Sequence, residues 1–321
     1  MNRRRAKLIL AMLMLLLMCN ACSSNTSYVN DVDSDVNSNI IISDNNLSEI
    51  LLQKINMVEA ISCDGDKIIV SGNTDENIKN LVFDSLINIL DIDGNILEEI
   101  KVNLTKNQSI LAIDMYDNNI WCLIDDYGDF NGETIADIKY SLIRLNHEGN
   151  IEKEVTIDFN IPDDEIVDIN SFIIGSNGKI YILQGKRELL IYDTSDSKLE
   201  QEPVDFGSLD VDDEGNIYAI NDSGEITYIT SQTQKDVFDT KLVMLPDSYQ
   251  IIAANTIIVK NGSDLYWISD FNTVPKQVFS LGDSDLTGDG IAEIKFLNDS
   301  SVLIHTYNKD YISKLSIISL D

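Results

Sequence analysis

Asn177-Gly178-Lys179-Ile180-Tyr181-Ile182-Leu183 is the stretch that decides the fold, because a close copy recurs as Glu214-Gly215-Asn216-Ile217-Tyr218-Ala219-Ile220. In both stretches a short polar turn with a glycine leads into an apolar run rich in Ile and Tyr. Gly, Asn and Asp tolerate positive φ at least cost, whereas Ile and Tyr favour strands. Each copy therefore predicts a tight turn that opens a β-strand.

The same turn recurs along most of the chain. It is centred on Gly65, Asn118, Gly178 and Gly215, with weaker equivalents at Asn255 and Asp299, at intervals of 37 to 60 residues. A blade of a β-propeller takes roughly 40 residues plus insertions. Helical periodicity is nearly absent, so the pattern predicts an all-β protein. The predicted units span residues 58–104, 105–160, 161–204, 205–243, 244–283 and 284–321.

The last unit has only three predicted strands, Glu293–Leu297, Val302–Tyr307 and Ser313–Leu320. One further strand, Ile50 to Met57, precedes the first unit and belongs to none. Closing a ring removes the exposed edges that an open sheet would leave. We therefore expect a six-bladed β-propeller whose last blade is completed by an N-terminal strand.

The amino terminus has the form of a secretory signal. A basic segment precedes an unbroken apolar run from Leu8 to Met18, which is too short for the roughly 20 residues of a spanning helix. The segment that follows resembles the lipobox of bacterial lipoproteins, with Ala21 before a lipidated Cys22, although Cys19 stands where Leu is usual. Cys19 as the acceptor, ordinary cleavage and an uncleaved anchor are the alternatives.

Residues 22–46 predict a flexible tether, since they are rich in Ser, Asn and Asp and poor in large apolar groups. We thus expect a signal peptide over 1–21, the lipidated tether over 22–46 and the propeller over 47–321. Two acyl chains suffice for stable anchoring. The predicted location is the outer face of the cytoplasmic membrane, with membrane contact through the lipid alone.

The charge balance narrows the choice of partner. There are 23 Lys and Arg against 54 Asp and Glu, and removing the signal would leave 19 basic residues against the same acids. A surface this negative repels phosphate backbones and anionic lipids, which excludes nucleic-acid binding. Cations, cationic ligands or a basic partner surface suit it, and solubility alone is the plainer interpretation.

One segment has the spacing of a calcium loop. Oxygen donors Asp285, Thr287, Asp289 and Glu293 stand at loop positions 1, 3, 5 and 9, and the carbonyl of Ile291 would serve at position 7. The spacing resembles the calcium loops of integrin-type propellers. The terminal glutamate of an EF-hand is missing, so the predicted site is weak, and a simple turn into the last unit is the alternative.

Other chemistry has little support in the sequence. Two histidines, His147 in a turn and His305 in a strand pattern, build no recognisable catalytic motif. Cys63 and Cys122 lie in strand patterns and are expected as buried free thiols, although export permits a disulfide. The longest insertion, 125–139, is a candidate ligand-binding loop. Its candidate contact residues are Tyr127, Asp129, Phe130 and Glu133.

The chain resembles the N-terminal half of certain large Gram-positive lipoproteins, in which a signal and lipobox lead into a six-bladed, TolB-like propeller. The matching features are Cys22, the Gly-Lys-Ile-Tyr and Gly-Asn-Ile-Tyr strand starts, and the stretch Asp283–Gly288. In that family a solute-binding domain of an ABC importer follows the propeller. This chain stops at Asp321 without one, so the resemblance implies a truncated, split or stand-alone propeller.

Three hypotheses of function follow. The first is a non-enzymatic binding or scaffold module that presents a propeller face to a protein or cell-envelope ligand. The second is an accessory or truncated component of an ABC solute importer. The third is an extracellular propeller enzyme with a metal in its channel, similar to lactonases. No cofactor is certain, and calcium is the one metal that the sequence suggests.

Overall fold

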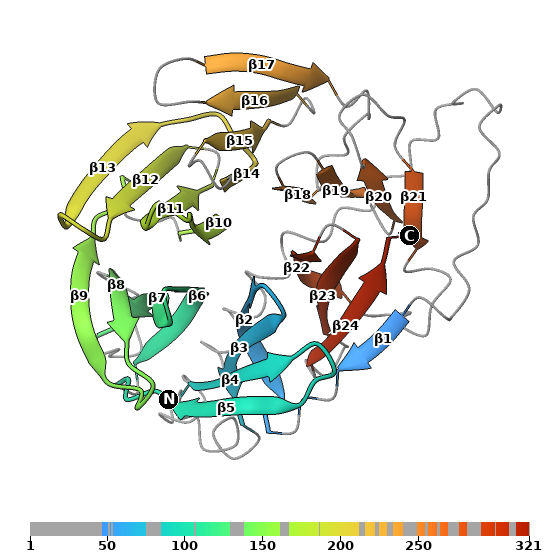
Figure 1. The fold of residues 1–321 in the computed structure, drawn as a ribbon. Helices are drawn as coiled ribbons and strands as arrows, with labels where there is room; N and C mark the ends of the chain where they lie inside the picture. The colour runs from blue at the N-terminus through green and yellow to red at the C-terminus, as the bar shows by residue number, and fades with distance from the viewer. Residues whose placement is uncertain are drawn as a thin grey trace, which may run out of the picture.

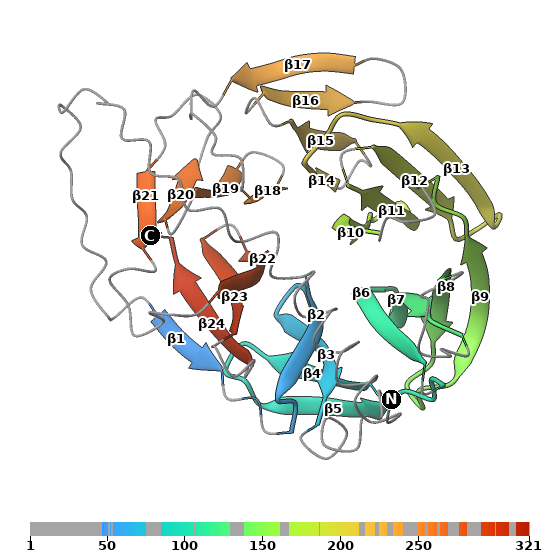
Figure 2. The same ribbon diagram turned by 180° about the vertical axis from the view of Figure 1, so that it is seen from behind.

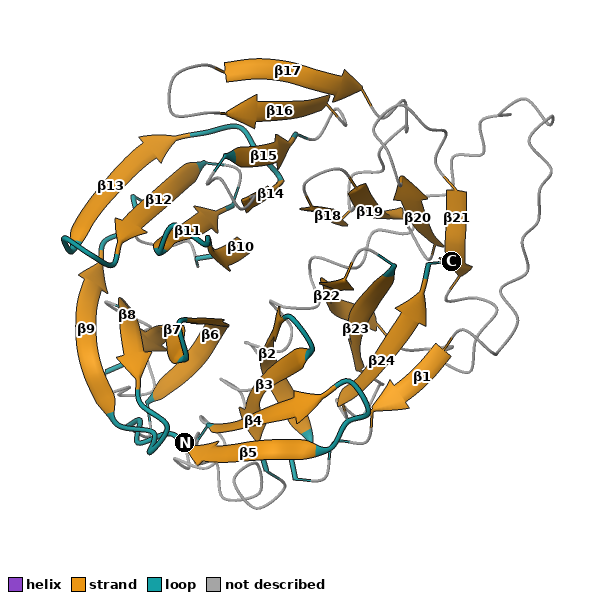
Figure 3. Cartoon of the chain, viewed as in Figure 1, coloured by secondary structure: helices purple, strands orange, loops and turns teal. Residues whose placement is uncertain are grey.

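The computed structural model shows an all-β chain. All regular elements among the described residues are strands (Figure 3), and none of these residues forms a helix long and apolar enough to cross a membrane. The described residues are 47–50, 52, 54–74, 85–105, 107–128, 138–160, 167–185, 187–211, 216–221, 225–229, 234–239, 249–253, 256–261, 264–268, 276–280, 290–298, 300–307 and 313–320. The predicted signal peptide, Cys22 and the tether lie outside them.

Within the described ranges the strands form six four-stranded antiparallel sheets. The first two sheets follow the order of the chain. They consist of β2 (Met57–Asp64), β3 (Lys67–Asn73), β4 (Leu86–Asp91), β5 (Ile96–Lys101), then β6 (Gln108–Tyr116), β7 (Asn119–Asp126), β8 (Lys139–Leu145) and β9 (Ile151–Ile157).

The next two sheets have the same plain order along the chain. They consist of β10 (Ile169–Ile174), β11 (Lys179–Gln184), β12 (Glu188–Asp193), β13 (Lys198–Pro203), then β14 (Ser208–Val211), β15 (Ile217–Ile220), β16 (Glu225–Ile229) and β17 (Gln234–Asp239).

The last two sheets bring the ends of the chain together. They consist of β18 (Tyr249–Ala253), β19 (Thr256–Asn261), β20 (Asp264–Ile268), β21 (Lys276–Ser280), then β22 (Gly290–Asn298), β23 (Ser301–Tyr307), β24 (Ser313–Ser319) and β1 (Leu47–Ile50).

The sheets stand around a common centre (Figures 1 and 2). The first strand of each sheet lies innermost, and each of these inner strands contacts the inner strand of the next sheet, from β2 through β22 and back to β2. The fourth strands, such as β5, β9 and β13, lie on the outside. The predicted all-β propeller is confirmed by this arrangement.

The strand that joins the two ends of the chain is shorter than predicted. β1 covers Leu47–Ile50 and pairs antiparallel with β24, from Leu47 opposite Ile318 to Ile50 opposite Leu315. The predicted strand Ile50 to Met57 was wrong in its bounds, because Met57 opens β2. Ile50 is buried against Leu315 and Leu303, so apolar contact holds β1 on the sheet.

Three of the predicted tight turns are confirmed, since Gly65, Asn118 and Gly178 have positive φ between the first two strands of their sheets. Gly215, Asn255 and Asp299 lie outside the described residues. Gly94 and Gly149 have positive φ in the turns from β4 to β5 and from β8 to β9. Gly149 also allows a close approach, since a Cβ there would stand 2.0 Å from the Lys101 carbonyl oxygen of the neighbouring sheet.

The core lies between neighbouring sheets. β7 is buried over six of its eight residues, whereas β13 is almost wholly exposed. One apolar cluster joins the β2–β5 and β6–β9 sheets, and a second joins β6–β9 to β10–β13. A buried second strand such as β7 therefore has a nearly continuous apolar sequence, whereas an outer strand such as β13 carries charges.

Candidate functional site

Four inner strands share a bulge at the same position. The pairing between the first and second strands skips one residue in the sheets that begin with β2, β6, β10 and β22, and a bulge of this kind re-aims nearby side chains. In two of these strands the first residue after the bulge contacts the neighbouring sheet. These residues are Glu293 of β22 and Ser171 of β10. The skipped residues are Glu59, Leu111, Asn170 and Ala292.

Side chains bridge the junctions between inner strands. In four consecutive junctions a side chain of one inner strand accepts a hydrogen bond from a backbone N–H of the next inner strand. That N–H faces away from its own sheet and so needs a partner from outside it. These contacts tie the sheets together where the ring is narrowest. The pairs are Glu293 with Ile61 N at 3.2 Å, Glu59 with Ile110 N, Asp114 with Ile174 N at 2.8 Å and Ser171 with Leu209 N at 3.2 Å.

Asp114 links three inner strands. Its carboxylate accepts hydrogen bonds from Ser62 Oγ of β2 at 2.6 Å, from Met115 N at 2.8 Å and from Ile174 N of β10. Burial raises the pKa of Asp114 to about 6, although these three donors and the charge of Lys295 oppose the shift. The carboxylate is therefore a structural acceptor inside the ring.

Polar residues occupy the same register on three neighbouring inner strands, β22, β2 and β6. Ser62, Asp114 and Lys295 each lie three residues beyond the bulge of their inner strands, in matching register positions. Lys295 Nζ contacts Glu293 Oε1 at 3.1 Å and its charge acts on Asp114. Among the described residues, no group of three or more His, Cys, Asp and Glu could hold a metal ion.

A second polar group lies where the β2–β5 and β6–β9 sheets meet. The Glu59 carboxylate accepts Asn73 Nδ2 at 2.6 Å and Ser85 Oγ at 2.9 Å. Asp125 accepts Ser109 N, Ser109 Oγ and the Tyr127 hydroxyl. We call Glu59, Asn73, Ser85, Asp125 and Tyr127 the Glu59–Asp125 cluster.

Both carboxyl groups of this cluster have raised pKa values. Desolvation raises the pKa of Glu59 to about 7, and the nearby charge of Asp125 adds to the shift against its hydrogen bonds. Burial also raises the pKa of Asp125. The pKa of the Tyr127 hydroxyl is raised by burial and by Asp125, so this hydroxyl stays a donor.

The predicted ligand-binding loop begins at this cluster. Tyr127 is described and donates its hydroxyl to Asp125, so it holds the start of the loop to the ring. Asp129, Phe130 and Glu133 lie outside the described residues. Their role in binding stays a prediction.

The predicted calcium loop is described only at its end. Asp285, Thr287 and Asp289 lie outside the described residues. The backbone of Ile291 pairs with Thr306 in the sheet, and the Glu293 carboxylate contacts Ile61 N and Lys295. Calcium binding stays a prediction. Glu293 also joins β22 to β2, because its carboxylate accepts the hydrogen bond from Ile61 N.

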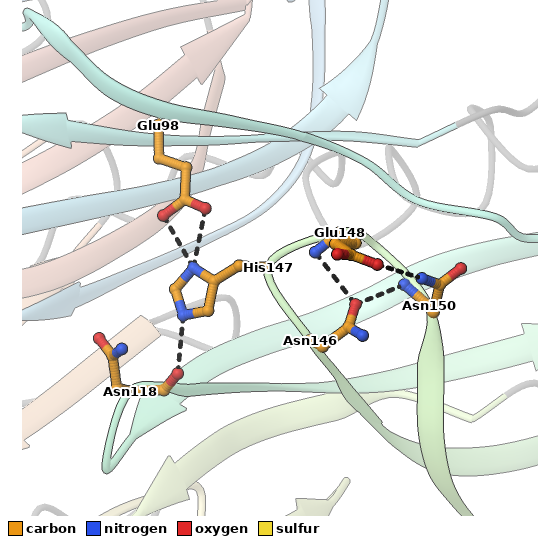
Figure 4. A network of polar contacts seen from close by, with 6 residues as sticks. All are labelled: Glu98, Asn118, Asn146, His147, Glu148 and Asn150. Carbon is orange, nitrogen blue, oxygen red and sulfur yellow. Dashed lines mark hydrogen bonds and ion pairs between the residues drawn. The ribbon is translucent and has the colours of Figure 1, made fainter.

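His147 lies in the turn from β8 to β9 and contacts the neighbouring sheet (Figure 4). Its Nδ1 lies 2.8 Å from the Glu98 carboxylate of β5, and its Nε2 lies 2.9 Å from the Asn118 carbonyl. The Asn118 carbonyl and then Glu98 raise the pKa of His147, because both favour the doubly protonated ring. The turn itself is closed by Asn146 Oδ1, which accepts Glu148 N at 3.0 Å and Asn150 N at 2.9 Å.

His305 belongs to the junction between the last and first sheets. Its ring nitrogen Nε2 lies 3.0 Å from Ser313 Oγ, which itself accepts Val58 N of β2 at 2.9 Å. Burial lowers the pKa of His305 to about 4, so the ring is neutral at neutral pH. The histidine is a hydrogen-bonded residue of the core.

Both body cysteines are free thiols, as expected. Desolvation raises the pKa of Cys63 to about 12 and raises that of Cys122 as well. A thiol is a nucleophile only when ionised, so neither cysteine is activated here.

Glu59, Asp114 and Asp125 were not among the residues predicted to be functional. The available signal was an acid inside an apolar strand run, as in Val58-Glu59-Ala60 and Ile113-Asp114-Met115. Such an acid needs a partner when buried. Some partners lie on another strand of the same sheet, as Asn73 does for Glu59, and others lie on the next sheet, as Ile174 does for Asp114, so they could not be named from the pattern.

No protein-family model and no curated protein matches the chain. Among solved structures, YCF48 bound to D1 peptide is similar at 11% identity, covering 87% of this chain and 99% of that one, with a TM-score of 0.49. BamB from Moraxella catarrhalis is similar at 8% identity over 81% of this chain and 85% of that one, with a TM-score of 0.41.

At such identities and TM-scores these likenesses say nothing about activity. The assignment of a propeller rests instead on the strand order of this chain and on the contacts between its inner strands.

Proposed function

We propose that this chain is an extracytoplasmic lipoprotein, lipidated on Cys22, whose six-bladed propeller is a binding platform for a basic protein or envelope ligand. The observation that carries the binding role is the Glu59–Asp125 cluster. Hydrogen bonds to Glu59 join the end of β3 to the start of β4, and Asp125 at the end of β7 is near enough for its charge to act on Glu59. The connection from β3 to β4 and the predicted ligand-binding loop after β7 therefore leave the ring beside one another.

The ring suits the role of a platform. Backbone N–H groups at the junctions are bonded to side chains of the neighbouring sheet, and apolar clusters fill the space between sheets. Ligands bind preferentially on loops that a rigid scaffold holds in place. Six blades follow if the pairing of β1 with β24 closes the ring in solution.

The charge of the chain favours a basic partner. With 54 acidic residues against 23 basic ones, it attracts cationic surfaces and speeds their association at low salt. The exposed acids of the outer strands are partly neutralised by ion pairs, such as Lys54–Glu99 and Arg144–Glu152. The candidate loop carries Asp129 and Glu133 in addition.

Neutralising the loop acids should weaken partner binding. In the double variant Asp129→Asn/Glu133→Gln we expect affinity for an envelope-derived basic peptide to fall about tenfold, roughly the value of two weak ion pairs. A matched control, Glu200→Gln/Glu202→Gln, removes two exposed acids from the outer strand β13. Calorimetric titration of both variants at low and physiological salt measures the change. Equal losses in the two variants would show that the loop is not the binding site.

A further inference from the structure

The buried Asn73 side chain has an amide oxygen without a hydrogen-bond donor among the described residues. Asn73 is 1% exposed, its Nδ2 donates to the Glu59 carboxylate at 2.6 Å, and its Oδ1 accepts no hydrogen bond within the described residues. A buried amide oxygen without a donor costs about 1–3 kcal/mol. An ionised Glu59 cannot supply that donor, because a carboxylate only accepts.

The surroundings of Glu59 contain acids and no described base. From β7 the Asp125 carboxylate acts on Glu59, and Cys122 of the same strand lies within its electrostatic reach. Burial, Asp125 and the charge of Glu59 raise the pKa of Tyr127, which follows β7. Burial and the charge of Asp125 raise the pKa of Tyr140 on β8. The neighbours on β3 and before β4, Asn73 and Ser85, are neutral. Two ionised carboxylates in this setting would repel one another with no compensating cation.

We propose that the Glu59–Asp125 cluster is a proton-binding site, in which Glu59 is held as a neutral carboxylic acid that donates its proton to Asn73 Oδ1. A protonated Glu59 has one O–H donor, and the Asn73 amide that already touches it provides the buried acceptor. The two side chains then form a reciprocal acid–amide pair across β2 and β3. The proton also removes the repulsion between Glu59 and Asp125.

The site couples pH to the junction between the first two sheets. Glu59 bridges β2 to Ile110 N of β6, so ionising it changes a contact that joins the sheets. The raised pKa of Glu59, about 7 against an ordinary 4.5, sets the direction of the effect. The folded chain holds the proton where the unfolded chain has lost it. Stability from this group is full below about pH 4.5 and is lost as pH rises through about 7.

The test compares the full-length chain with Glu59→Gln. Glutamine keeps the shape, stays neutral and can still donate to Asn73, so it mimics the protonated acid. We expect the melting temperature of the wild-type protein to fall between pH 5 and pH 8, and that of Glu59→Gln to fall clearly less. Glu49→Gln, an exposed glutamate of β1, should behave as wild type. An unchanged pH dependence in Glu59→Gln overturns the proposal.

A second measurement does not depend on the variant being folded. In wild-type protein labelled with carbon-13 at glutamate carboxyl groups, one signal should titrate with a midpoint near pH 7. If every glutamate signal titrates near its ordinary value, Glu59 is ionised at neutral pH and the proposal is wrong.

Discussion

Replacing Gly149 with alanine is expected to lower the free energy of unfolding by about 3 kcal/mol or more. Gly149 has φ of 77°, and an added Cβ would stand 2.0 Å from the Lys101 carbonyl oxygen of the first sheet. That oxygen belongs to backbone, so it can retreat only if the junction between the sheets opens. Opening it would stretch the bond from Asn103 N to the Gly149 carbonyl, now 3.2 Å.

Gly65→Ala is the matched control for this prediction. Gly65 also has positive φ, at 57°, but a Cβ there would meet nothing within 4 Å. It should therefore cost only the strain of left-handed backbone, about 1 kcal/mol. Urea unfolding of both variants gives the comparison. Equal losses would mean that Gly149 and Lys101 do not approach as closely as the structure shows.

Replacing Cys22 with alanine is expected to move the whole population of the protein from the membrane fraction to the soluble fraction. Without the thiol no lipid can be attached, and the strongly acidic body has no attraction of its own for anionic lipid. Fractionation of cells, followed by immunoblotting, measures the shift. Cys19→Ala is the control and should stay with the membrane. A Cys22→Ala protein that remains membrane-bound would contradict lipidation at this position.

The strands could be predicted because their signals are local. Turns centred on Gly65, Asn118 and Gly178 require positive φ. The runs on either side of each turn become the inner strand and the second strand of a sheet. β1 was misplaced because Leu47-Ser48-Glu49-Ile50 has little strand character of its own. It becomes a strand by pairing with β24, at the other end of the chain, which no local pattern reveals.

The polar junctions were less accessible to sequence reasoning. Asp114 is visibly out of place in an apolar run, but its bond to Ile174 N depends on which sheet stands next in the ring. The bulge that brings Glu59 to Asn73 and Ser85 also has no signature in a single sequence. The candidate site thus depends on which sheets stand next to one another in the ring, whereas the strands follow from local turn residues.

A disulfide between β1 and β24 would test directly whether the two ends of the chain close the ring. Ser48 lies opposite Ile317 in the pairing of β1 with β24. Neighbouring positions on paired strands have the spacing that a disulfide needs. In the full chain, Ser48→Cys/Ile317→Cys should form a disulfide under mild oxidation, seen by mass spectrometry as one cross-linked peptide. Ser48→Cys/Ser319→Cys, two residues out of register, should form it much less. No cross-link in the first pair, or equal yields in both, would contradict the closed ring.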